Sequence, residues 1–277
     1  IRCWDLKSII MNALVFPGLD LTNLYQLVLT FFFSSLRISA LLISMPFFST
    51  SFIPLQVRIV LSMCITFFIF QTIKLPNLME MSVLSIFIII LAEIGLGLSV
   101  GFILNILFSA ASVSGEKIAS TAGLSMANMV DPQSGGQTLV ISTVLSLFLI
   151  SIFLSLDGHL FLIKMIIESY NYLPIGESLN FREVSNAGIF AFGRMLYLGS
   201  LIMLPVVGGM LLINLAGGII TRSAPTLNLF SFIFPITLIG VFIFLYLALG
   251  TIANAFSDLV GISINLIDNV LHSKEYK

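Results

Sequence analysis

Charged residues are scarce in this chain, and their scarcity excludes most classes of protein. Only 9% of the 277 residues are Asp, Glu, Lys or Arg, whereas 58% are hydrophobic. Soluble domains carry about a quarter charged residues, so this composition cannot supply the surface of a soluble fold. The mean hydropathy of +1.12 points the same way. We therefore predict an all-α integral membrane protein.

The chain also lacks the residue patterns of several functions. A net charge of −1 leaves no basic stripe for nucleic acid. The two cysteines, Cys3 and Cys64, are too few for a disulfide framework. No HExxH, no GxSxG and no nucleotide-binding loop occurs in the sequence. We therefore expect no enzyme, no cofactor, no bound metal and no nucleic-acid partner.

Long hydrophobic runs are present and predict membrane helices. They occupy residues 22–48, 57–73, 81–111, 140–156, 160–167, 186–222 and 227–256. The last two runs are joined by a short turn, so we expect an antiparallel helical hairpin there. Asp157-Gly158-His159 interrupts the middle of the chain and is typical of a turn at a helix boundary. Residues 1–20 are expected to be an N-terminal extension outside the fold.

Small and polar residues recur every four positions in the run over residues 81–111, at Glu93, Gly97, Gly101 and Asn105. This spacing places them on one face of a helix. Gly97 and Gly101 form a GxxxG pair, which lets a second backbone approach closely in a membrane. Asn105 can then form a hydrogen bond between the two helices.

Two charged residues lie inside apolar runs, Arg37 in the first and Glu93 in the third. A charge at the centre of a membrane costs about 3 kcal/mol or more, so Arg37 should face protein or water, unless it extends to the membrane surface. Glu93 is a candidate for proton or cation handling, or for an ion pair with Arg37 or Arg194. Since no second acidic residue occurs at helical spacing, we favour a carboxyl group that joins helices by hydrogen bonds.

The stretch over residues 112–137 is small, polar and Met-containing, yet it lies between apolar runs. Non-helical backbone is tolerated at membrane depth only where protein buries it or water reaches it. The stretch therefore predicts a flexible segment beside a water-filled path.

Short motifs occur in a fixed order along the chain. The central ones are Glu93-Ile-Gly-Leu-Gly, Gly101-Phe102, Ser114-Gly115-Glu116, Gly123-Leu124-Ser125 and Asp131-Pro132. On either side of them lie Leu36-Arg37, Pro46, Ile53-Pro54, Asp157-Gly158-His159, Leu173-Pro174-Ile175-Gly176, Leu204-Pro205-Val206, Asn214-Leu215-Ala216, Arg222, Ala224-Pro225 and Phe234-Pro235. Together they resemble the family of flagellar biosynthetic protein FliR and its virulence-secretion relatives, the SctT export-gate proteins. Two positions depart from the pattern: Ser114, where many members have alanine, and Ile233, where glycine is expected.

This resemblance implies a structural and gating subunit of a type III protein export gate, with the flagellar type closer than the virulence type. It implies bent helical hairpins, with a FliP-like region over residues 21–190 and a FliQ-like hairpin and tail over 191–277. The implied partners are FliP-type and FliQ-type subunits, an FlhB-type protein, unfolded secreted proteins in transit and membrane lipid. The implied location is the bacterial inner (cytoplasmic) membrane, within the flagellar or injectisome basal body.

The resemblance also implies a plug loop across the closed pore at residues 115–136. Its expected members are Gly115, Gly123, Leu124, Ser125, Met126, Met129, Asp131 and Pro132. A second set should pack helices or bury polar groups: Arg37, Glu93, Gly97, Gly101, Asn105, Arg222 and Pro225. We expect the plug to block ions and water at rest and to yield to unfolded substrate.

The alternative function is a secondary transporter that uses Glu93 as an intramembrane proton or cation site. Residues 112–137 would then form a broken-helix substrate site. Such a fold predicts a second interrupted segment, and the runs around Pro205 and Pro235 are the candidates, although they lack a matching carboxylate. An intramembrane enzyme acting through His159 would lack a second catalytic group.

Overall fold

The regular structure of the chain is helical. The computed structural model describes residues 21–48, 53–70, 73, 76, 81–124, 140–177, 181–223 and 229–271. Within these ranges no β-strand occurs. The helices are α2 (Leu21–Ser44), α3 (Leu55–Ile69), α4 (Val83–Thr121), α6 (Val140–Ser155), α7 (Gly158–Tyr172), α8 (Phe181–Ser223) and α9 (Leu229–Leu271).

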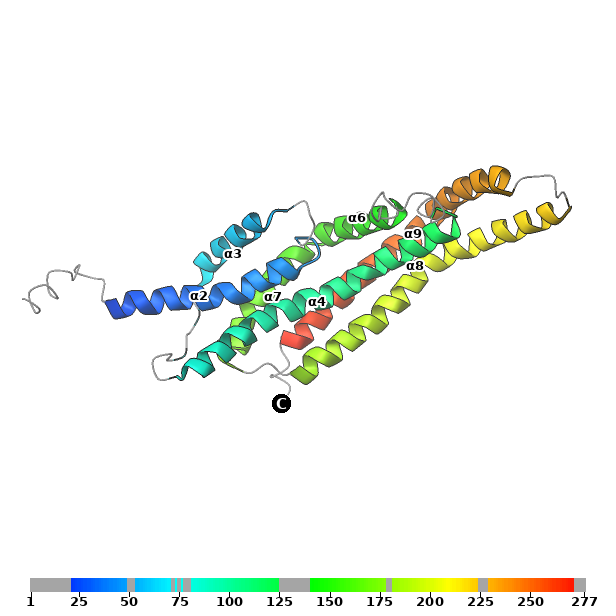
Figure 1. Cartoon of the computed structure of the whole chain (residues 1–277). Helices are drawn as coiled ribbons and strands as arrows, with labels where there is room; N and C mark the ends of the chain where they lie inside the picture. Colours follow the sequence, from blue (N-terminus) through cyan, green and yellow to red (C-terminus); the bar gives the residue numbers. More distant parts are fainter. Residues whose placement is uncertain are drawn as a thin grey trace, which may run out of the picture.

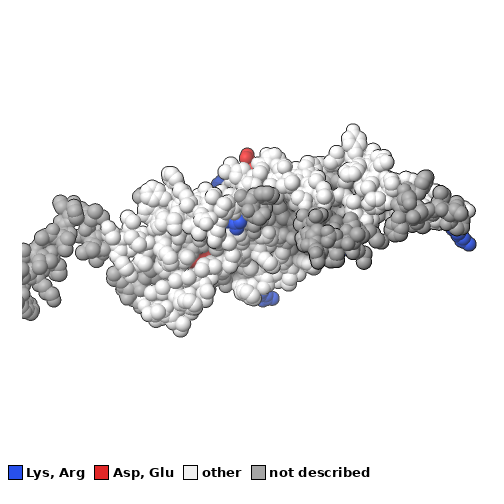
Figure 2. Space-filling view, turned by 45° about the horizontal axis from the view of Figure 1, so that its top comes forward, with Lys and Arg blue, Asp and Glu red and all other residues white. Residues whose placement is uncertain are grey.

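Four of these helices, α2, α4, α8 and α9, are long and apolar enough to cross a membrane. Helices α6 and α7 would make a fifth span if the pair is counted as one, with a bend of 62° between them. Figure 2 shows a surface with few charged atoms, as a lipid or protein environment requires. The predicted all-α integral membrane fold is confirmed.

Helix α4 is the centre of the arrangement. It contacts α2, α6, α8 and α9, and its contacts with α8 and α2 are the most extensive between any two described helices. In Figure 1, α2 lies against one half of α4, while α8 and α9 run beside the other half and extend beyond its end. Helices α8 and α9 pack against each other as the predicted antiparallel hairpin.

The bend between α6 and α7 lies at Asp157 and Gly158. Asp157 has a φ of 55°, in the left-handed region that Asp tolerates better than most residues. A Cβ atom on Gly158 would lie 2.5 Å from Cδ2 of Phe153, so the turn leaves no space for a larger residue. The helix boundary predicted from this motif is present.

Helix α4 continues further than the sequence predicted. It is helical to Thr121, so residues 115–121 of the predicted plug loop belong to the helix, which corrects the loop's expected start. Small residues allow this because they bring neighbouring helices close. Ser114 is fully buried, with its hydroxyl 3.0 Å from the carbonyl of Gly199 on α8. Gly115 faces the backbone of Ser142 on α6.

Helix α9 also extends beyond its expected end near Phe256 and reaches Leu271. The apolar residues of this last part are buried, among them Leu259, Val260 and Ile267, and α9 contacts α7. The domain boundary predicted between residues 190 and 191 lies inside α8. Helices α8 and α9 continue through their internal prolines, Pro205 and Pro235.

Gly97 and Gly101 place α4 directly against α2. A Cβ atom on Gly97 would lie 2.7 Å from Cβ of Ala40, and one on Gly101 would lie 2.6 Å from Cβ of Ser44. Both distances are too short for real side chains, so the two helices approach as closely as the glycines permit.

Alanine at Gly101 should therefore destabilise the chain by about 1–3 kcal/mol, because it overpacks a contact that has no free space. The matched control is Gly250→Ala on α9, where no described atom beyond the adjoining helix backbone lies within 4 Å of the added methyl group. This control should be neutral or slightly stabilising, since alanine favours helix. Thermal unfolding of the two variants in detergent measures the difference, and equal melting temperatures would contradict the close contact.

Candidate functional site

A buried ion pair joins α2 to α4. Arg37 and Glu93 are 0% and 1% exposed. The guanidinium donates two hydrogen bonds to the carboxylate, from Nε to Oε2 at 2.8 Å and from Nη2 to Oε1 at 3.1 Å. This two-pronged geometry is the strongest arrangement for such a pair. Of the two partners that the sequence offered Glu93, the structure shows Arg37.

The remaining donors of Arg37 reach α7. Nη1 donates to Oγ of Ser169 at 2.8 Å, and Nη2 donates to the carbonyl of Leu173 at 2.9 Å. The guanidinium also lies 4.1 Å from the ring centroid of Tyr170, close enough for a cation–π interaction. The Tyr170 hydroxyl donates to the carbonyl of Ser34 on α2 at 2.7 Å. One arginine thus connects three helices.

The position of this cation also suits α7. Leu173 comes directly after the last residue of α7, where unpaired carbonyls give a helix end partial negative charge. Since Arg37 already contacts both carboxylate oxygens, a proton or metal cation at Glu93 would have to compete with it. Arg194, the other candidate, lies 5.1 Å from the ring of Phe190 on its own helix.

Helix α4 ends in a Schellman cap inside the segment predicted as the plug, residues 115–136. Gly123 has a φ of 81°, which favours glycine. Its N–H donates to the carbonyl of Ser120 at 3.1 Å, and the N–H of Leu124 donates to that of Ala119 at 3.0 Å. Leu124 packs against the hydrophobic core. These two expected plug residues therefore form the base of the segment.

The remaining predicted site residues do not gather at one place in the structure. Gly115 lies in α4 against α6, and Arg222 lies exposed in the last turn of α8, where a cation favours the helix dipole. Outside the described residues are Ser125, Met126, Met129, Asp131, Pro132 and Pro225. Among the residues that are described, no group of three His, Cys, Asp or Glu side chains could hold a metal ion.

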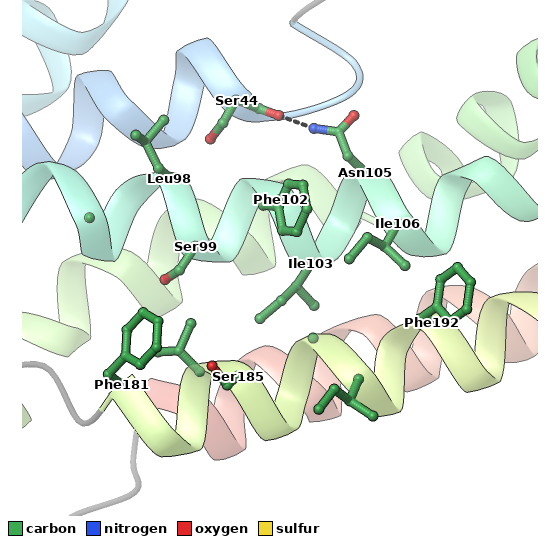
Figure 3. A pocket seen from close by; sticks show the side chains of 14 residues that line it. Ser44, Leu98, Ser99, Phe102, Ile103, Asn105, Ile106, Phe181, Ser185 and Phe192 are labelled. Atoms are coloured by element: carbon green, nitrogen blue, oxygen red, sulfur yellow. Dashed lines mark hydrogen bonds between the residues drawn. The ribbon is translucent and has the colours of Figure 1, made fainter.

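An open groove of about 830 Å³ separates α4 from the first turns of α8. Phe102, Ile103 and Ile106 line it from one side, and Phe181, Ile189 and Phe192 line it from the other. In Figure 3, Asn105 lies at its edge and donates to the carbonyl of Ser44. None of the described residues that line the groove is charged. Its apolar lining suits an apolar chain.

Three residues that contact Arg37 or the end of α4 were not predicted from the sequence. Ser169 and Tyr170 lie on α7, where nothing in their spacing links them to Arg37. Thr237 on α9 contacts the end of α4, and a lone threonine in an apolar run carries no signal. Asn214 contacts the same helix end, and its only signal was its place in one of the motifs.

Comparison with known proteins gives consistent matches over most of the chain. The sequence model of the bacterial export proteins, family 1, matches residues 28–262. Flagellar biosynthetic protein FliR of Escherichia coli (strain K12) is 33% identical over 212 residues, covering 75% of this chain and 79% of that protein. FliR of Bacillus subtilis (strain 168) is 27% identical over 254 residues, covering 91% and 98%. FliR of Aquifex aeolicus (strain VF5) is 29% identical over 244 residues, covering 87% and 94%.

Removing one partner of the Arg37–Glu93 pair should destabilise the chain strongly. Arg37→Ala and Glu93→Ala should each cost about 3–5 kcal/mol, because each leaves a buried charge without its partner. The control is the exposed pair of Lys164 and Glu168, 3.7 Å apart with 66% and 44% of the side chains exposed. Lys164→Ala should change stability by about 1 kcal/mol or less. Accumulation in the membrane and thermal unfolding measure both.

A double variant tests whether Glu93 stabilises the fold or acts as a proton or cation site. Arg37→Met with Glu93→Leu removes both charges and should recover much of the lost stability. A variant that accumulates and exports protein shows that Glu93 serves packing alone. A variant that accumulates normally but has lost all transport would contradict this and favour the transporter.

Proposed function

Since the chain belongs to the bacterial export proteins, family 1, we propose that it is a structural and gating subunit of a flagellar-type type III protein export gate. Membership makes the chain a membrane component of a flagellar export apparatus. The finer proposal is that it forms part of the secretion pore, and that the segment after Gly123 closes this pore at rest.

One observation carries the gating role: the helices on either side of that segment are already neighbours. Ser142, near the start of α6, donates to the carbonyl of Ser112 on α4 at 3.1 Å. Packed helices need only about 2–8 residues between them, yet residues 122–139 separate α4 from α6. A connection this much longer than packing requires is commonly functional.

The composition of this long connection suits a seal that can yield. It contains Met126 and Met129 among small residues. Methionine side chains adapt their shape to irregular gaps, which suits a surface that closes and then yields. We propose that it blocks ions and water by steric and hydrophobic closure, and that unfolded substrate displaces it.

The uncovered surface of the helices supports assembly with other subunits. In the apolar 18-residue stretch of α9, only 22% is buried within the chain. In the corresponding stretch of α8, 28% is buried. Lipid or partner helices must cover the remainder. We propose FliP-type and FliQ-type subunits and an FlhB-type protein as these partners, with residues 21–190 FliP-like and 191–277 FliQ-like. The proposed location is the inner membrane within the basal body.

The transporter alternative is weaker. Its required cation site is Glu93, and both oxygens of that carboxylate accept hydrogen bonds from Arg37. No catalytic activity is proposed for the chain.

Deleting residues 123–128 tests the seal. In cells whose gate still assembles, we expect the membrane to become permeable to small ions, because the deletion removes the base of the plug and Met126. Ion leak, export and complex assembly are measured together. An assembled gate with unchanged leak would refute the sealing role.

A double substitution disturbs the segment less than the deletion does, and a single substitution elsewhere serves as its control. Met126→Ser with Met129→Ser should leak without loss of assembly, because polar side chains weaken a hydrophobic seal. Met63→Ser on α3, where the methionine is 48% exposed, should not leak. Leak from Met63→Ser as well would show a general defect of the membrane domain.

A further inference from the structure

The end of α4 is held by the α8–α9 hairpin, and this contact lies where the proposed plug segment begins. The role inferred for the contact rests on the proposed function, because the residues concerned touch the base of the plug. These residues are Asn214 on α8 and Thr237 on α9.

The last carbonyls of α4 show why this contact matters. The carbonyls of Ile118, Ala119 and Ser120 accept hydrogen bonds from the N–H groups of Ala122, Leu124 and Gly123. The next two carbonyls, those of Thr121 and Ala122, lie beyond the reach of this cap. Ala122 is fully buried, so its carbonyl needs a partner, because unpaired backbone groups away from water are costly. The carbonyl of Thr121 is open to solvent and gains a protein partner in addition.

The hairpin supplies both partners. Nδ2 of Asn214 donates to the carbonyl of Thr121 at 3.2 Å. Oγ1 of Thr237 lies 3.3 Å from the carbonyl of Ala122, and both residues are buried. Each of the two carbonyls thus has a donor from a different helix of the hairpin, α8 for the first and α9 for the second.

Thr237 has a second acceptor within its own helix. Its hydroxyl also lies 2.9 Å from the carbonyl of Phe234, so a single proton has two alternative acceptors. If α4 moves away from α9, the hydroxyl keeps a hydrogen bond to Phe234. The contact can therefore be released without leaving the donor unpaired.

Close packing between α8 and α9 positions the side chains of Asn214 and Thr237. Ile233 occupies the space next to Gly217, where a Cβ atom would lie 2.6 Å from its Cδ1. Isoleucine at this position, unusual for the resembled family, is thus accommodated by a glycine on α8. Phe234 lies beside Gly123, with 3.6 Å between its ring and an added Cβ atom. The hairpin and the base of the plug are in direct contact.

We propose that Asn214 and Thr237 are positioning residues that clamp the base of the plug to the α8–α9 hairpin and keep the gate closed. Movement of the hairpin relative to α4 releases the clamp and frees the plug segment. The hairpin therefore controls opening, and neither residue touches the substrate.

Removing the hydroxyl of Thr237 tests the clamp. Thr237→Val keeps the shape of the side chain and should raise ion leak through the assembled gate about fivefold, the factor that one neutral hydrogen bond contributes. Asn214→Ala should have a smaller effect, because its bond is exposed to solvent. Thr237→Ser retains the hydroxyl and should restore the tight state, which loss of packing alone would not explain.

The matched control is Thr221→Val on α8. The hydroxyl of Thr221 bonds within its own helix, to the carbonyl of Gly218 at 3.0 Å, and should not affect leak. If Thr237→Val leaks no more than Thr221→Val, the clamp is overturned. Leak in Thr237→Ser as large as in Thr237→Val overturns it too.

A reducible crosslink tests whether the clamp must open. Thr121→Cys and Asn214→Cys, in a chain with Cys3 and Cys64 replaced by serine, are joined by a short bis-maleimide that contains a disulfide. Export should stop on crosslinking and return on reduction. Export at the full rate through crosslinked chains would show that α4 and the hairpin need not separate.

The two proposals fail in different ways. If the deletion of residues 123–128 leaks while Thr237→Val does not, the plug stands and the clamp is refuted. If the deletion itself does not leak, the sealing role fails, and the clamp fails with it.

Discussion

A charged side chain with no access to water determines how the first part of this protein is built. Arg37 lies in the middle of an apolar helix, fully buried, and it must have its hydrogen bonds from protein. Glu93 on α4 and the end of α7 supply them. Because a buried charge without a partner is so unfavourable, α2, α4 and α7 can take up few other arrangements. The glycines at 97 and 101 add the close contact between α2 and α4.

The same helix that is fixed at Glu93 ends at Thr121, close to the start of the proposed sealing segment. Its anchored half gives the segment a fixed starting point, and its far end is held by weaker and replaceable contacts from the α8–α9 hairpin. A fixed helix with a releasable end suits a gate, because opening then requires little rearrangement of the buried pair. Catalysis is not needed for such a role.

The sequence predicted the features that depend on hydrophobic pattern and backbone geometry: the helical membrane fold, the hairpin and the boundary at Asp157. The resemblance placed the plug's start at Gly115, which is too early, and the small and polar residues from 112 onward favoured a flexible segment because their neighbours on α6 and α8 were unknown. The sequence could not choose between Arg37 and Arg194 for Glu93, since that choice depends on which helices meet. Thr237 was missed because one hydroxyl in an apolar run is ordinary until its partner is seen.

The most direct measurement of the sealing role is electrical. The purified, assembled gate carrying Met126→Cys, with Cys3 and Cys64 replaced by serine, is placed in a planar lipid bilayer, and a positively charged thiol reagent is added. If this segment closes the pore, the bilayer conducts little current before the reagent and much more after it, because a fixed charge cannot remain in a dry seal. A conductance that is high from the start, or that the reagent leaves unchanged while the cysteine is fully modified, would contradict closure of the pore by this segment.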